Sequence, residues 1–180
     1  MEVTGRQMME DFFTGRRDTI LKKWAERIFA SYPAGSITFL KNNLDPFNNP
    51  VGNTIVEETA VLFDQLNGAM AEETVLPSLE RIIKIRAVQE FSPSEAVSFV
   101  FLLKDILLHE LSKHRSDEAN QDRLMEIFSN IDRMALMAFD IHADCRERIS
   151  RIRLEEAKMS AFMRRERLIR KDATDKDNEK

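Results

Sequence analysis

The chain has 180 residues, a formal net charge of −4, and only five glycines and five prolines. Sandwiches, barrels and doubly wound sheets need many turns, which depend on those two residue types, so the composition excludes them and favours long helices. A single cysteine excludes an internal disulfide. No apolar stretch approaches the roughly 20 residues of a membrane span, and the N-terminus lacks the pattern of a secretory signal. We therefore expect a cytoplasmic protein.

The first helices are predicted from apolar residues that recur every three to four positions. Residues 1–15 form either an N-terminal arm or a short helix that Gly15 ends. A firmer helix spans residues 20–32, with apolar side chains opposite charged ones, and Pro33 ends it. A short helix is then predicted over residues 36–43.

Turn chemistry predicts the next boundaries. Asn49 suits the N-cap of a helix, Pro50 suits its first position, and Asn67-Gly68 closes it. Another helix is predicted over residues 76–86, where Pro77 is tolerated because it would lie in the first turn.

The strongest local signal is a capping box at Ser92. The Ser92 hydroxyl can accept from the amide of Glu95, while the Glu95 carboxylate reaches back to the amide of Ser92. The helix that follows, over residues 93–113, is apolar on nearly all sides through Leu103. A helix of this kind is surrounded by others, so we place it at the centre of the fold.

The last helix is predicted to begin near Asp117 and to run to about residue 171, because no glycine or proline interrupts it. Its first part has a wide apolar stripe, and beyond Ile141 only a narrow track with alternating spacings of three and four stays apolar, as in a coiled coil. After Ile152 the register falls on Glu156 and Glu166, so the apolar track is expected to end there. The alternative is a helix fully buried in its own subunit and followed by a frayed tail. The predicted dimer interface consists of Ile131, Ala135, Ala138, His142, Cys145, Ile149 and Ile152.

The charge divides unevenly along the chain. Residues 146–171 contain ten Lys/Arg and four Asp/Glu, a net charge of +6, whereas residues 1–145 have a net charge of −8. An acidic body thus carries a basic arm, whose four acids and scarce aromatic residues argue against nucleic acid as a partner. Residues 171–180 are polar enough to be disordered.

No pattern of chemistry-bearing residues predicts an enzyme, a metal site or a cofactor. His109 and His114 are five apart, whereas two ligands on one helix face need a spacing of four. His142 and Cys145 could hold a soft metal only where two chains meet, and a buried polar pair is the favoured interpretation. There is no glycine-rich phosphate loop, and no Ser-His-Asp or Cys-His arrangement can be defended from spacing.

Three segments carry a resemblance to a known family: IRAVQEFSPSEAV at residues 85–97, NPVGNT at residues 49–54, and Lys23-Trp24. By them the sequence, over about residues 15–150, resembles the N-terminal sensory domain of RsbR/RsbRD-type proteins, the RsbT co-antagonists of bacterial stress signalling. The resemblance implies a globin-like helical bundle, usually without haem, that pairs through its last helices. In that family a STAS domain usually follows. Because the sequence ends at Lys180 without one, we expect the module to act on a separate signalling protein.

The expected domain organisation follows from the resemblance and the charge pattern. We expect residues 16–150 to be the sensor domain and residues 151–170 to be a basic helical extension. The chain as a whole is expected to be a non-enzymatic signalling module that forms a homodimer. The alternative function is a haem- or small-ligand-binding globin-like sensor. Arg86, Gln89 and Glu90 are a candidate ligand pocket, although these polar groups could equally satisfy exposed backbone ends.

Overall fold

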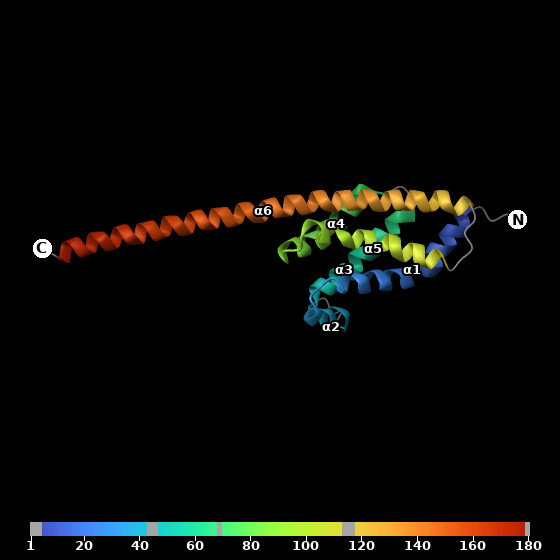
Figure 1. The fold of residues 1–180 in the computed structure, drawn as a ribbon, viewed down its shortest axis with the longest axis horizontal. Coiled ribbons are helices and arrows are strands. Elements are labelled where there is room, and N and C mark those ends of the chain that lie inside the picture. Colours follow the sequence, from blue (N-terminus) through green and yellow to red (C-terminus); the bar gives the residue numbers. More distant parts are fainter. Residues whose placement is uncertain (1–4, 43–46, 68–69, 113–117, 179–180) are drawn as a thin grey trace. The chain divides into compact units, whose positions relative to one another are not determined.

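The computed structural model describes residues 5–42, 47–67, 70–112 and 118–178. Within these ranges the chain forms six α-helices, one short 3-10 helix and no strand, which confirms the predicted all-α fold with a long C-terminal helix (Figure 1). The chain has two compact units, Met1–Ala143 and Asp144–Lys180. The first is a helical bundle, and within the second residues 144–178 are the C-terminal part of the last helix.

The first helix, α1, runs from Gly5 to Phe29 without interruption, so the predicted stop at Gly15 is wrong. Gly15 is exposed, and a Cβ atom added there would have nothing within 4 Å. A single exposed glycine weakens a helix by only about 1 kcal/mol, which the burial of Phe13 and Ile20 on either side outweighs. After Pro33 the short helix α2 follows at Ala34–Asn42.

Asn49 caps helix α3, Pro50–Asp64, as its sequence predicts. Its Oδ1 accepts a hydrogen bond from the Gly52 amide at 2.8 Å, and its Nδ2 donates to the Leu40 carbonyl at 3.1 Å. One buried side chain therefore opens α3 and ties it to the end of α2. The 3-10 helix η1, Gln65–Asn67, follows directly.

Helix α4 spans Glu72–Val88, so it begins earlier than predicted and Pro77 lies inside it rather than in its first turn. Glu72 and Glu73 occupy the first turn, where carboxylates interact favourably with the positive end of the helix dipole. Helix α5, Pro93–Leu111, opens with the predicted capping box: the Ser92 amide donates to Glu95 Oε2 at 2.9 Å, and the Glu95 amide donates to Ser92 Oγ at 3.4 Å.

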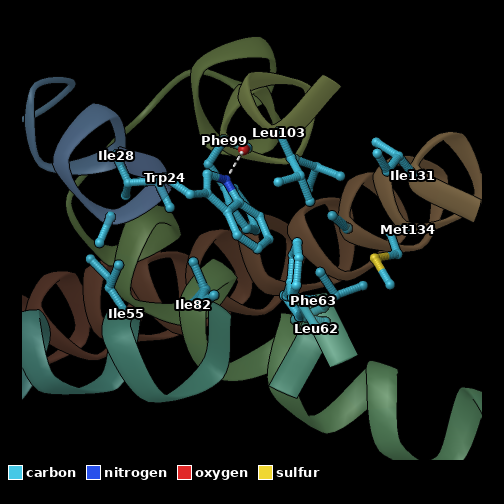
Figure 2. Close-up of a cluster of buried hydrophobic side chains, with 14 of the residues drawn as sticks. Trp24, Ile28, Ile55, Leu62, Phe63, Ile82, Phe99, Leu103, Ile131 and Met134 are labelled. Atoms are coloured by element: carbon cyan, nitrogen blue, oxygen red, sulfur yellow. Dashed lines mark hydrogen bonds between the residues drawn. The ribbon is translucent and has the colours of Figure 1, made fainter. Parts of the chain in front are cut away.

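The core of the bundle gathers apolar side chains from α1, α3, α4, α5 and α6 (Figure 2). At its centre Trp24 Nε1 donates to the Phe99 carbonyl at 2.7 Å, and the two rings stack with their centres 6.3 Å apart. Helix α5 is not enclosed on all sides as predicted, because Phe101 and Leu108 are 45% and 48% exposed. One side of α5 packs in the core, and its outer face is exposed to solvent.

Helix α6 spans Glu118–Asn178. Its first part joins the bundle: Lys104 Nζ lies 2.6 Å from Asp132 Oδ1, and Arg133 Nη2 lies 2.6 Å from Glu72 Oε1. The helix includes residues 171–178, which were expected to be disordered, and no glycine or proline interrupts residues 118–178.

Candidate interaction surfaces

The first four residues of the predicted dimer track lie inside their own subunit. Ile131, Ala135, Ala138 and His142 are at most 4% exposed. The stripe that carries them closes the apolar core of the bundle, so these four side chains cannot meet a second chain unless the core opens. The predicted interface is therefore restricted to its C-terminal part, namely Cys145, Ile149 and Ile152.

The same track continues into the unit Asp144–Lys180, where its side chains reach the surface. Cys145 and Ile149 are half-buried and Ile152 is 55% exposed. Met159 and Met163 follow at the same spacing; they are also exposed and lie beyond the predicted interface. The exposed track, defined as Cys145, Ile149, Ile152, Glu156, Met159, Met163 and Glu166, is apolar except for its two glutamates.

Charged side chains, most of them basic, lie beside the N-terminal part of the exposed track. Arg148 and Arg153 flank it in the sequence, and Arg151 Nη2 lies 2.8 Å from Glu147 Oε1 one helical turn away. A charged, solvated helix surface with a narrow apolar seam is typical of a helix that pairs with another helix.

The candidate ligand pocket does not assemble. Arg86 is fully buried, whereas Gln89 and Glu90 are exposed where α4 ends. Arg86 Nη2 donates to Ser31 Oγ and to the Glu95 carbonyl, both at 3.0 Å. The guanidinium therefore binds a backbone carbonyl in the first turn of α5.

Arg86 sits in an aromatic cage. Its guanidinium carbon lies 4.4 Å from the centre of the Phe91 ring and 5.6 Å from the centres of the Tyr32 and Phe99 rings. Burial lowers the pKa of Arg86 and raises the pKa of Tyr32. Nε and Nη1 of Arg86 have no hydrogen-bond partner among the described residues, so the cation relies on ring faces more than on polar partners.

A shallow groove of about 780 Å³ lies on the outer face of α5. Val97, Phe101, Leu102 and Phe139 form its apolar wall, and Asp105 is its one carboxylate. Phe139 of α6 is 51% exposed. This groove is a second apolar surface that a partner could cover.

The remaining polar candidates do not converge on a chemical site. His109 is exposed on α5, His142 is buried, Asp140 and Asp144 are exposed, and His114 lies outside the described residues. Among the described residues no three histidine, cysteine or carboxylate side chains are placed to hold a metal ion. In the same ranges no helix combines the length and the apolar composition that crossing a membrane requires. The haem or small-ligand alternative stays an untested hypothesis.

Comparison with known proteins gives one match. Residues 18–157 match the family described as the RsbT co-antagonist protein rsbRD N-terminal domain. No curated protein and no solved structure matches the chain. The matched range covers most of the bundle and the first part of the exposed track. The chain therefore belongs to the family of RsbT co-antagonist rsbRD N-terminal domains, as its sequence motifs suggested.

Proposed function

We propose that the chain is a non-enzymatic signalling module that forms a homodimer through the exposed track of α6 and modulates a separate signalling protein. Membership of a co-antagonist family supports a role in signalling. The dimer and the separate partner are the specific parts of the proposal.

One observation carries the dimer proposal. Residues 144–178 are a stretch of helix in which Ile152, Met159 and Met163 are about half exposed or more. An isolated helix in water is marginally stable, and most helical stability in proteins comes from burying an apolar face. Burying one aliphatic side chain contributes roughly 1.5–3 kcal/mol, so a second copy that covers this track would stabilise the helix considerably.

A dimer offers a simple means of signalling. A ligand or partner shifts a conformational equilibrium only by binding one state more tightly than the other. Because α6 is continuous from the core residue Ile131 to the exposed Ile152, a change in core packing can alter the pairing of two copies. The basic surface around the track is then available to a partner protein.

Sedimentation velocity of single-site variants tests the proposal. Ile149→Asp places a charge in the track and is expected to convert the dimer into a monomer, since a buried carboxylate without a partner is costly. Ser150→Asp adds the same charge about 100° away around the helix and should leave the dimer intact.

The groove on α5 is the competing interface, and its own variant separates the two. Phe139→Asp removes the exposed ring that closes the groove and should not change the sedimentation coefficient. A dimer that survives Ile149→Asp but dissociates with Phe139→Asp would move the interface to the groove and contradict the proposal.

A further inference from the structure

The groove on the outer face of α5 exposes phenylalanine rings that lie outside the core. Phe101 of α5 and Phe139 of α6 line the groove and are 45% and 51% exposed. Two residues before and after Phe101, Phe99 and Leu103 point into the core (Figure 2). Residues two apart on a helix point nearly opposite ways, so α5 has one apolar face toward the core and a second one toward solvent.

The second apolar face is regular enough to receive another helix. Val97, Phe101 and Leu108 follow one another on α5 at spacings of four and seven residues, which keeps them along one side of the helix. They extend over about 16 Å, or three helical turns. On α6 Leu136 lies one turn before Phe139 and is 68% exposed. Single exposed apolar residues are ordinary, whereas a group of them around a groove marks an interaction site.

A net negative charge lies beside the groove. Asp105 lines it, and its Oδ2 is 3.4 Å from Arg27 Nη2. Lys104 and Asp132 form a pair that is neutral as a whole, with Nζ and Oδ1 2.6 Å apart. Asp140, the next residue after the groove phenylalanine of α6, is exposed and has no ion-pair partner among the described residues. Its carboxylate is therefore available to a cation from another molecule.

These features define the partner that fits the groove. An amphipathic helix buries its apolar side in such a groove through residues at i, i+3 or i+4, and i+7. The uncompensated carboxylate, and the net charge of −8 on residues 1–145, favour Lys or Arg beside the apolar side of that helix. The same charges repel nucleic acid and anionic membranes. They also disfavour the bundle of a second copy, which carries the same negative charge.

We propose that the groove on α5 is the docking site for the separate signalling protein, which presents a basic amphipathic helix to it. The inference rests on the separate partner of the proposed function and adds the site and the chemistry of that partner. The groove lies in the unit Met1–Ala143 and the exposed track in the unit Asp144–Lys180, so different residues carry the docking site and the homodimer.

A pair of designed peptides tests the proposal on the intact chain. The probe is a fluorescein-labelled helical peptide of about 18 residues, or five turns, with leucine along one side and lysine on both flanks. The comparison peptide has glutamine in place of every lysine. Fluorescence anisotropy should show the lysine peptide binding at least about fivefold more tightly than the glutamine peptide, and added salt should reduce that difference.

Two substitutions and a matched control locate the bound peptide. Phe101→Gln and Phe139→Gln each remove a ring from the groove, and each should weaken binding of the lysine peptide about tenfold. Phe39→Gln removes a 52% exposed ring from α2 and should leave binding unchanged. Because all three rings are about half exposed, we expect the fold to persist, and urea unfolding followed by Trp24 fluorescence checks this.

A charge variant tests the chemistry of the partner separately. Asp140→Asn should weaken binding of the lysine peptide about threefold and leave the affinity for the glutamine peptide unchanged. Glu57→Gln is the control, since Glu57 is an exposed carboxylate of α3 that does not line the groove. It should alter neither affinity.

The outcomes separate this inference from the proposed homodimer. A lysine peptide that does not bind, or that binds the Phe101→Gln and Phe139→Gln chains as tightly as wild type, overturns the docking site. A glutamine peptide that binds as tightly as the lysine peptide overturns the basic chemistry of the partner. If Phe139→Gln alone dissociated the dimer, a second copy would occupy the groove, which also overturns the inference. A chain that is monomeric in sedimentation but binds the lysine peptide in the groove overturns the homodimer alone.

Discussion

The guanidinium of Arg86 lies 4.4 Å from the centre of the Phe91 ring, five residues further along the chain. Between them α4 ends in a Schellman motif, in which the Phe91 amide donates to the Arg86 carbonyl at 3.2 Å and the Glu90 amide donates to the Ala87 carbonyl at 3.3 Å. Such motifs usually carry a hydrophobic contact between these two positions. Here a buried cation makes that contact and links the end of α4 to the start of α5.

Two substitutions of Arg86 should have different effects on stability. Arg86→Ala leaves a cavity and removes the donor to Ser31 and Glu95, so we expect a loss of about 2–4 kcal/mol in the free energy of unfolding. Arg86→Met keeps the volume and removes a buried charge, so it should stay within about 1 kcal/mol of wild type. Urea unfolding followed by the fluorescence of Trp24, the only tryptophan, measures both. Equal losses would mean that the charge itself is required.

Glu90 is held in the left-handed region, with φ of 63°, where glycine is favoured. Glu90→Gly should therefore stabilise the bundle by about 0.5–1 kcal/mol. The neighbouring Gln89, with φ of −79°, is the matched control, and Gln89→Gly should give no gain. If Glu90→Gly destabilised the protein, its side chain would have a role that the backbone geometry does not explain.

The capping box should give a pH dependence with a defined sign. Hydrogen bonds from the Ser92 hydroxyl and amide lower the pKa of Glu95, with a smaller contribution from the Arg86 charge. A lowered pKa in the folded state contributes stability above the unfolded value of about 4.3, and that stability is lost as the pH falls through the folded value. Glu95→Gln should thus lower the urea midpoint at pH 7, and the difference from wild type should shrink as the pH falls through the folded-state pKa of Glu95. A difference that persisted at low pH would contradict this account.

The two glycines with contrasting surroundings should respond oppositely to alanine. Gly15→Ala fills open space in an exposed helix interior and should add about 1 kcal/mol of stability. A Cβ atom at Gly52 would lie 2.8 Å from Asn49 Cγ, so Gly52→Ala should displace the cap of α3 and cost about 1–2 kcal/mol. Thermal unfolding measured side by side distinguishes them. A destabilised Gly15→Ala would mean that α1 needs flexibility there.

Local chemistry made part of the fold predictable. The caps at Asn49 and Ser92 could be predicted because their partners lie within three residues in the sequence. The continuity of α1 through Gly15 could not be predicted, because it depends on the burial of the side chains that flank the glycine. The Trp24–Phe99 contact joins residues 75 apart, and no local pattern predicts such a contact.

The interaction surface was predictable only in part. Apolar residues at spacings of three and four give the same sequence pattern whether they face a core or a second chain. The sequence pattern therefore does not distinguish Ile131 from Ile152. They differ only in that the bundle covers the first and not the second. The position at which the bundle ends is a tertiary property. Likewise Arg86 could be picked out as polar beside a helix start, but its complete burial depends on the rings of Tyr32 and Phe99.

Sedimentation velocity of the intact chain over a wide concentration range tests the central claim most directly. The chain has a mass of 20.9 kDa, and the account predicts a reversible species of twice that mass whose population rises with concentration. A single particle of one chain's mass at the highest concentration would contradict it.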